Sequence, residues 1–262
     1  MDMQDMQDML DMLFGHRRDA MSGHSKWSNI KHRKERTDAQ RGKIFTKLGR
    51  EIAVVVRSGG ADPESNNKLK DVIAKAKSLN MPTDNIMRSV KKAAGDAGGA
   101  SYEEIAYEGY GPGGVAVIVE AMTDNKNRTA GDVRHFFDKY GGNMGTTGCV
   151  TFQFNRKGLL VVLKEQKPDE DEVMMEALDA GAEDVISLED VYEIYTDPDG
   201  FSAVREAMEN KQYVFEEAGI EMIPTTTVKI SEAKLAEQME KLVDALEDLD
   251  DVQSVFHNWD ED

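Results

Sequence analysis

Residues 158–222 read GLLVVLKEQKPDEDEVMMEALDAGAEDVISLEDVYEIYTDPDGFSAVREAMENKQYVFEEAGIEM. Short apolar runs alternate with amphipathic stretches, which predicts strands at 159–163, 184–187, 192–196 and 219–223 and helices at 170–178 and 200–208. This β-α-β-β-α-β order is that of a ferredoxin-like module. The segment carries 4 Lys or Arg against 19 Asp or Glu. Its surface should therefore repel nucleic acid, and it either is simply solvated or suits a basic protein partner.

The segments on both sides of this acidic module predict the two parts of another domain. Before it, a hairpin of strands is expected at 105–122, then a helix that ends at Tyr140 and a strand at 149–154. After it come a strand at 225–230, a helix at 232–249 and a strand at 252–256. We therefore expect a central α/β domain of two chain segments, 101–157 and 223–262, with the ferredoxin-like acidic module of residues 158–222 inserted between them.

Residues 22–98 predict a small basic helical domain. Apolar residues recur at three- and four-residue steps in a first helix at 42–57, a second that starts at Asp62-Pro63, and a third that starts at Thr83. A glycine-rich linker follows at 95–100. The domain has 17 Lys or Arg against 8 Asp or Glu, although the whole chain has a formal net charge of -18. The expected fold class is α+β.

The basic run from Ser22 to Lys43 stands out against this acidic background. Its cations are Lys26, Lys31, Arg33, Lys34, Arg36, Arg41 and Lys43. Lys and Arg placed against phosphates release condensed counterions, so such a run on an anionic protein favours a nucleic-acid partner. Its rings, His24, Trp27 and His32, can stack on bases or pack against sugars. The alternative is a solvated basic face on which Trp27 is a buried anchor.

A second, smaller basic cluster consists of Lys126, Arg128 and Arg134, at the start of the helix that ends at Tyr140. Asp124, Asn125 and Asn127 beside it have side chains that cap free amides of a helix start, which is the structural interpretation of this stretch. The functional interpretations are a second phosphate contact or an interdomain clamp. The nearby glycines 109–114 match G-x-G-x-x-G, but a strand follows them, so they predict a hairpin rather than a dinucleotide site.

Five motifs in the same order resemble the YebC family. They are GHSKWSNIKHRK (23–34), GKIFTKL (42–48), NMP (80–82), YEGYGPGGVA (107–116) and TDNKNRT (123–129). The resemblance extends from Met21 to the end of the sequence. It implies a probable DNA-binding transcriptional regulator, and it also implies relatives that activate translation in mitochondria or on bacterial ribosomes.

The remaining sequence predicts no catalytic chemistry. The five histidines lack metal-ligand spacing, and no nucleophile elbow, zinc-protease motif or P-loop is present. We expect no enzyme activity, no cofactor, no metal and no small-molecule substrate. The single Cys149 fits a reducing compartment, and no apolar run reaches the ~20 residues of a membrane span. A cytoplasmic location without membrane contact is expected, and residues 1–21 are expected to be a leader or added segment outside the fold.

These observations predict a non-catalytic nucleic-acid-binding regulator of gene expression, with DNA-binding transcription regulation as the first hypothesis. The first alternative is a translational activator that binds ribosomal RNA, with the acidic module turned toward basic ribosomal proteins. The second is a protein-interaction adaptor that acts through the acidic module. No recognition helix of the helix-turn-helix kind is evident, so the sequence favours backbone contact over base readout.

Overall fold

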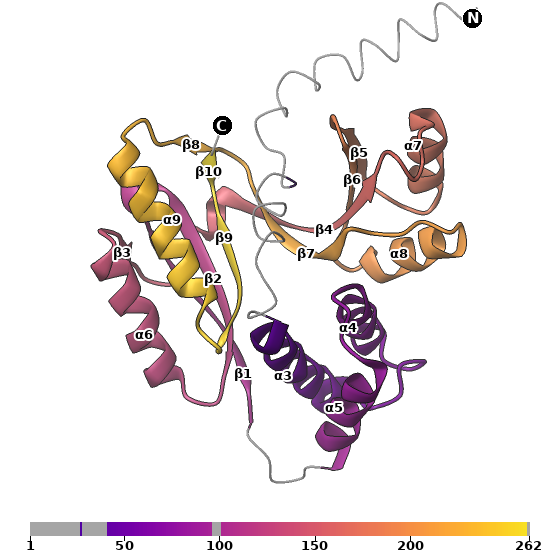
Figure 1. The fold of residues 1–262 in the computed structure, drawn as a ribbon, viewed down its shortest axis with the longest axis horizontal. Coiled ribbons are helices and arrows are strands. Elements are labelled where there is room, and N and C mark those ends of the chain that lie inside the picture. Colours follow the sequence, from indigo (N-terminus) through magenta and orange to yellow (C-terminus); the bar gives the residue numbers. More distant parts are fainter. Residues whose placement is uncertain (1–26, 28–40, 96–100, 261–262) are drawn as a thin grey trace, which may run out of the picture.

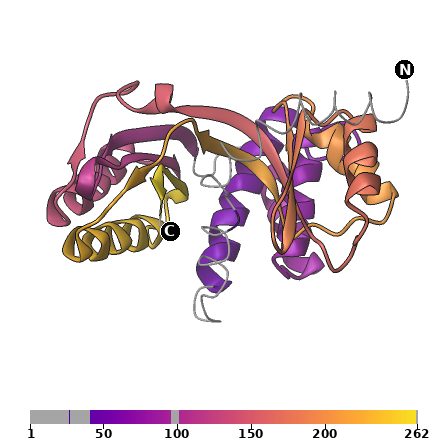
Figure 2. The ribbon, with the colours of Figure 1, turned by 90° about the horizontal axis from the view of Figure 1, so that it is seen from above.

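The computed structural model describes Trp27 and residues 41–95 and 101–260 (Figure 1). In this part of the chain, a group of three helices precedes two antiparallel sheets, each of which is covered by helices. The predicted α+β class is confirmed. The helical group contacts both α/β parts and lies between them in Figure 2.

The N-terminal helices are α3 (Arg41–Gly59), α4 (Asn67–Ser78) and α5 (Thr83–Gly95). Their apolar stripes meet in a shared core that includes Leu48, Ile52, Leu69 and Ile86. Packing of such stripes, more than helix propensity, stabilises short helices.

The second helix begins later than predicted. Asp62-Pro63 does not start it, because residues 62–65 form a turn in which Asp62 accepts the N–H groups of Glu64 and Ser65. The cap is the buried Asn66, whose Oδ1 accepts the Leu69 N–H at 3.1 Å. Its Nδ2 also donates to the carbonyl oxygens of Val55 and Gly60, at 2.9 and 2.8 Å. Asn66 therefore joins the end of α3 to the start of α4.

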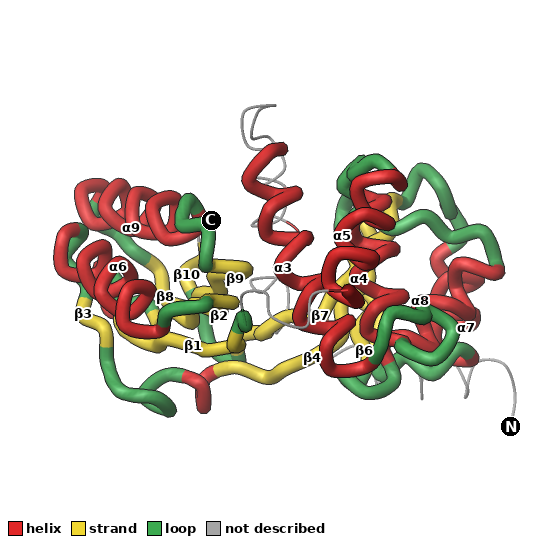
Figure 3. The backbone as a smooth tube through the Cα atoms, turned by 90° about the horizontal axis from the view of Figure 1, so that it is seen from below, coloured by secondary structure: helices red, strands yellow, loops and turns green. Residues whose placement is uncertain are grey.

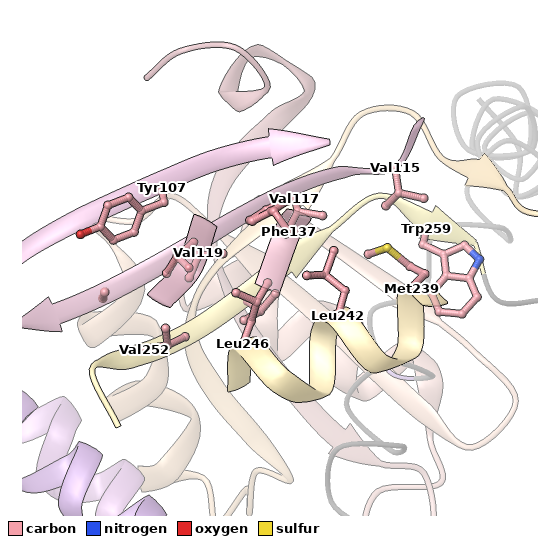
Figure 4. Packing of buried hydrophobic residues seen from close by; sticks show 13 residues of the cluster. Tyr107, Val115, Val117, Val119, Phe137, Met239, Leu242, Leu246, Val252 and Trp259 are labelled. Atoms are coloured by element: carbon pink, nitrogen blue, oxygen red, sulfur yellow. The ribbon is translucent and has the colours of Figure 1, made fainter. Parts of the chain in front are cut away.

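The central sheet has the order β3-β1-β2-β9. Its strands are β1 (Glu103–Tyr110), β2 (Ala116–Thr123), β3 (Asn143–Met144) and β9 (Val252–His257). Helices α6 (Lys126–Lys139) and α9 (Ala233–Glu247) cover one face. Figure 4 shows Val117 and Val119 of β2 pointing toward Phe137 of α6 and Leu242 and Leu246 of α9. The predicted hairpin and the return of the chain into this sheet through β9 are confirmed.

Two predicted strands of the central domain are wrong. Residues 149–153 do not pair with a strand; Thr151–Gln153 form a short 3-10 turn (η3) instead. The reason is that the N–H groups of Val150 and Thr151 donate to the buried carboxylate of Glu108. At 225–230 only β8 (Val228–Lys229) forms, and it pairs with β10 (Trp259–Asp260) in a separate two-stranded sheet.

The acidic module has the predicted β-α-β-β-α-β order. Its elements are β4 (Phe154–Leu163), α7 (Glu170–Asp179), β5 (Asp184–Ser187), β6 (Val191–Thr196), α8 (Phe201–Asn210) and β7 (Glu217–Pro224). The antiparallel sheet order β5-β6-β4-β7 is the ferredoxin-like arrangement, and α7 and α8 pack on one face.

Strands β4 and β7 carry the chain into and out of this module. They pair from Phe154 opposite Pro224 to Val161 opposite Glu217, so the paired region extends beyond residues 158–222. The long strands that connect the two sheets are visible in Figure 3. The division into three domains remains our proposal.

Candidate nucleic-acid interface

The cations of the N-terminal helices fall into two sets. One set forms ion pairs or hydrogen bonds with acidic residues or carbonyl groups elsewhere in the protein. The other set is exposed and forms no ion pair among the described residues. Only the second set leaves its charge available to a polyanion.

Helix α3 directs three cations of the first set at the turn between α9 and β9. Lys43 Nζ lies 2.6 Å from Asp248 Oδ1, and Lys47 Nζ donates to the Glu247 carbonyl oxygen at 2.6 Å. Arg50 Nη1 donates to the Asp250 carbonyl oxygen at 2.6 Å and lies 2.5 Å from Asp251 Oδ1. The side chains of Arg50 and Asp251 are 16% and 10% exposed, so water screens this pair less than a surface pair.

Asp251 is the centre of this contact. Its Oδ2 accepts Arg128 Nη2 at 2.7 Å and the Thr129 hydroxyl at 2.7 Å, while its Oδ1 binds Arg50. Burial raises the pKa of Asp251, but the hydrogen bonds from Arg128 and Thr129 and the charge of Arg50 outweigh burial and hold this pKa below its ordinary value. The carboxylate therefore stays ionised and joins α3, α6 and the start of β9.

Helix α4 contacts the acidic module in a similar way. Arg205 of α8, which is 2% exposed, lies 3.0 Å from Asp71 Oδ1, and Ser202 donates a short hydrogen bond to the same carboxylate. Lys70 forms an ion pair with Glu206. The hydrogen bond to Glu206 raises the pKa of Lys70 above its ordinary value. This contact fixes the basic domain to the least basic part of the chain.

The second set of cations lies on the outer surfaces of α4 and α5. Arg88, Lys91 and Lys92 are exposed and stand three and four positions apart, so they share one face of α5. Lys68 and Lys77 of α4 are exposed as well. Among the described residues, no ion pair neutralises these five side chains. They are the cations that the structure leaves available for phosphate groups.

Most of the predicted basic run lies outside the described residues. His24, Lys26, Lys31, His32, Arg33, Lys34 and Arg36 belong to that part. Arg41 and Lys43 open α3, where Arg41 is exposed and Lys43 is partly exposed and paired with Asp248. The assignment of the run to nucleic acid therefore stays a prediction.

Trp27 is described, and it lies against the acidic module. Its ring packs on a buried cluster formed by Leu159, Val161, Val191 and Tyr195, on the sheet face that α7 and α8 leave open. Its backbone N–H donates to Glu193 Oε1 at 2.7 Å, and the Tyr195 hydroxyl donates to the other oxygen of this carboxylate at 2.6 Å. This is the anchoring role that the sequence offered as the alternative. The predicted stacking of Trp27 on a base would require the ring to leave this site.

The second basic cluster is largely engaged within the protein. Lys126 pairs with Glu103 at 2.6 Å, and Arg128 pairs with Asp124 and Asp251 at 2.8 and 2.7 Å. Hydrogen bonds to Asp251 and Asp124 raise the pKa of Arg128 above its already high value. Asn125 caps α6 by accepting the Arg128 N–H at 3.1 Å. Of the three cations, Arg134 alone has no ion pair among the described residues. The pairs of Lys126 and Arg128 lie within the central domain, and Arg128 takes part in the contact with the helical domain only through Asp251, which it shares with Arg50.

The sequence did not predict the junction at Asp251. The acids 248, 250 and 251 follow the last long helix, and the basic face of α3 is complementary in charge, but neither signal says that the two meet. Because residues 99–262 contain so many acids, the sequence does not indicate which acid pairs with another domain and which is only solvated.

No group of three or more potential metal ligands occurs in residues 41–95 and 101–260. None of the helices in this part of the chain is long and apolar enough to span a bilayer.

Two family models together match almost all of the described chain. A family model described as the TACO1/YebC protein N-terminal domain matches residues 25–96, and a model described as the TACO1/YebC second and third domain matches residues 102–259. The chain belongs to the TACO1/YebC family. The YebC resemblance carried by the five sequence motifs is thereby confirmed.

Relatives within the TACO1/YebC family are similar over almost their whole length. A protein of Acetivibrio thermocellus is 63% identical over 239 residues, which cover 91% of this chain and 99% of the relative. A protein of Clostridium novyi is 56% identical over 238 residues, which cover 91% and 96%. Both carry the name probable transcriptional regulatory protein. The crystal structure of a conserved hypothetical protein from Aquifex aeolicus matches with a TM-score of 0.80 and 48% identity, covering 90% of this chain and 96% of that one.

Proposed function

We propose that this TACO1/YebC protein is a non-catalytic nucleic-acid-binding regulator of gene expression that acts in the cytoplasm. The observation that carries the proposal is the exposed row of Arg88, Lys91 and Lys92 on α5, which no acid among the described residues neutralises. In a chain with 50 acidic residues, three uncompensated cations on one helix face form a local site for phosphates. The names of the relatives support transcription regulation as the first form of this function.

The arrangement of the domains supports the same proposal. The contacts of α3 with the α9–β9 turn and of α4 with α8 hold the basic domain in one orientation, so its outer cations have a fixed position. The predicted phosphate contacts from the run that contains Lys31, Arg33 and Lys34 would add to these cations. Fixed and additional cations together would bind a sugar-phosphate backbone without reading its bases.

The experiment that tests the proposal compares two triple variants with a charge-matched control. Arg88→Ala/Lys91→Ala/Lys92→Ala and Lys31→Ala/Arg33→Ala/Lys34→Ala each remove three candidate phosphate contacts. The control, Lys229→Ala/Lys234→Ala/Lys241→Ala, removes three exposed cations from the central domain. Fluorescence anisotropy with labelled DNA and RNA, measured at several salt concentrations, gives affinity and salt dependence.

Each test variant should weaken binding to all nucleic acids about equally. The slope of log K against log salt should fall by roughly 0.9 for each lost phosphate contact, so by roughly 2 to 3 for three contacts. The control should keep the slope of the unmodified protein. Unchanged affinity in both test variants, or no association of the unmodified protein with DNA or RNA at low salt, contradicts the proposal.

A translational activator bound to ribosomal RNA is the second candidate function. It is favoured by the acidic module, where α7 exposes Met175 by 66% and Leu178 by 47% among carboxylates. An apolar patch with an acidic border is complementary to basic proteins such as those that coat ribosomal RNA. Sedimentation of the cellular protein with ribosomes, compared with its retention on promoter DNA at equal salt, chooses between the two forms. Capture of a protein partner by the intact chain without any nucleic acid would instead support the adaptor hypothesis.

A further inference from the structure

The loop between β3 and β4 displays an exposed aromatic ring. Phe152, in the 3-10 turn Thr151–Gln153, is 74% exposed, more than the other large apolar side chains that are exposed in the described part of the chain. Figure 3 shows this loop as an outward bend of the chain that includes a short helical turn. Exposing a phenyl ring to water is unfavourable, and at this exposure almost the whole ring is accessible to a partner.

The backbone that carries Phe152 is firmly held. The carboxylate of Glu108, which is 3% exposed, accepts the N–H groups of Gly148, Val150 and Thr151 at 2.7, 2.9 and 2.9 Å. Burial raises the pKa of Glu108, but these hydrogen bonds outweigh burial and hold this pKa below its ordinary value. An ionised acceptor with three donors therefore fixes the backbone on both sides of Cys149 and into the turn.

Side chains next to Phe152 complete this support. The Tyr110 hydroxyl donates to the Cys149 carbonyl oxygen at 3.2 Å and accepts a hydrogen bond from Gln153 Nε2 at 3.3 Å. The Gln153 carbonyl oxygen accepts the Thr225 N–H at 2.8 Å. A ring on such a pre-organised loop loses little conformational entropy when it binds a partner.

The surroundings of the ring indicate the kind of partner. No Asp or Glu occurs between Lys139 and Lys164, although the chain contains 50 acids. The nearest acid in the loop's hydrogen-bond network, Glu108, is buried and engaged by three donors. The loop itself therefore places no exposed carboxylate beside the ring that would repel a phosphate group.

A protein partner would be expected to meet a contiguous apolar patch. The neighbours of Phe152 in the loop are instead glycines and the exposed residues Thr146, Thr147 and Thr151, of which Thr151 hydrogen-bonds to Glu108 through its hydroxyl. The one other exposed ring nearby, Tyr110, is half as exposed as Phe152, and its hydroxyl is engaged by Cys149 and Gln153. A flat ring in such polar surroundings fits the face of a nucleobase, while the hydroxyls of Thr146 and Thr147 fit sugar and phosphate oxygens.

We propose that Phe152 is a stacking platform for an unpaired base of single-stranded nucleic acid. The inference rests on the proposed function and adds to it a preference for unpaired strands. A base inside a duplex is stacked on both faces and cannot reach the ring. The cations of α5 serve duplex and single strand alike, whereas Phe152 serves only the single strand.

The test compares Phe152→Ala and Phe152→Trp with Val214→Ala, which truncates another exposed apolar residue, 62% exposed, in the acidic module. Anisotropy is measured with a labelled 20-nucleotide oligo-uridine, oligo-thymidine and a mixed-sequence DNA duplex at one salt concentration. Thermal unfolding of each variant is recorded alongside, and sedimentation velocity reports self-association.

Phe152→Ala should weaken single-strand binding about 5- to 100-fold and leave duplex binding within about twofold. Phe152→Trp should retain affinity, and its indole fluorescence should be quenched by the oligonucleotide. Val214→Ala should bind as the unmodified protein does. Equal single-strand affinity of Phe152→Ala and the unmodified protein overturns the inference but leaves the proposed function standing. Loss of self-association in Phe152→Ala without loss of single-strand binding would assign the ring to a protein contact and also overturn it. No nucleic-acid binding by the unmodified protein would defeat both proposals.

Discussion

Arg50 of α3 and Asp251, the residue before β9, form an ion pair of 2.5 Å between side chains that are mostly shielded from water. The two residues are 201 positions apart in the sequence. Their contact joins the basic helical domain to the central sheet, and Arg128 approaches the same carboxylate from α6. From composition alone, these charged residues would be expected only to be solvated. In the structure they determine how the helical domain is placed against the central sheet.

Replacing Asp251 should destabilise the protein more than replacing any exposed acid of the same turn. Asp251→Ala leaves Arg50 without its shielded partner and removes the acceptor of the Thr129 hydroxyl, so the free energy of unfolding should fall by about 2 to 4 kcal/mol. Urea unfolding followed by circular dichroism measures the change. Asp248→Ala is the control, because the Asp248 side chain is 62% exposed, and it should cost less than about 1 kcal/mol. Equal losses in the two variants would show that the junction contributes no special stability.

Stability should decrease in acid through Glu108 and Asp251. The pKa of each is below its ordinary value in the folded protein, so each carboxylate stabilises the fold at pH values above its unfolded pKa of about 4. This contribution is lost as pH falls through the lower, folded pKa values. Urea midpoints measured from pH 6 to pH 3 should therefore decrease less steeply in Glu108→Gln than in the unmodified protein. Glu165→Gln, which removes an exposed carboxylate, should retain the original slope.

Glu108→Gln should also loosen the loop that carries Phe152. An amide has only one acceptor oxygen and directs its own N–H groups at the donors of Gly148, Val150 and Thr151. We expect a loss of about 1 to 3 kcal/mol in the free energy of unfolding. Hydrogen exchange should accelerate in residues 145–153 more than in α6. An unchanged exchange rate in this loop would mean that other contacts hold it.

A methyl group at Gly158 should be poorly tolerated. A Cβ built there would lie 2.7 Å from Phe201 Cδ2 and closer still to Thr196 Oγ1, in the core between β4 and α8. Gly158→Ala should lower the free energy of unfolding by about 1 to 3 kcal/mol through overpacking. Gly219→Ala on the paired strand β7 is a matched control, because a Cβ there meets no atom within 4 Å. A melting temperature that is equal in both variants would contradict this account.

The fluorescence of Trp27 should show whether its ring contacts the acidic module. The chain has two tryptophans, so Trp259→Phe leaves the fluorescence of Trp27 alone. Its emission should be blue-shifted and protected from acrylamide, because the ring packs on Leu159 and Val161. Glu193→Ala removes the acceptor of the Trp27 N–H and should increase acrylamide quenching. Quenching equal to that of the urea-unfolded chain would contradict the contact. Addition of an oligonucleotide to the same protein tests whether a base displaces the ring from the sheet.

Much of the fold could be predicted because its signals are local. The period-two and period-3.6 patterns of residues 158–222 predicted the ferredoxin-like order, and the glycines and proline at 111–114 predicted the hairpin of β1 and β2. The predictions were wrong where a side chain that could not be foreseen took the backbone N–H groups of a segment. Glu108 takes the N–H groups that a strand at 149–154 would have used, and Asn66 takes over the cap that Asp62 was expected to provide.

The candidate site could be predicted only in outline. Local charge identified the N-terminal domain as basic, but not which cations its own protein neutralises. Lys43 was expected to face a phosphate and pairs with Asp248, whereas Arg128, for which a phosphate contact and an interdomain clamp were both open, pairs with Asp251. Phe152 was included in a strand and not singled out, because exposure of one ring depends on loop geometry that has no periodic signal in the sequence.

The central sheet also constrains the order in which the molecule is completed during synthesis. Ala116 of β2 donates its N–H to Asn258, 142 residues later in the chain. Strands β1 and β2 therefore leave the ribosome long before β9, which pairs with the free edge of β2, has been synthesised. The acidic module, which lies between β2 and β9 in the sequence, has all of its own strands before β9 is made. During this interval the emerging chain carries an unpaired β2 edge, which can pair with the strands of other nascent chains.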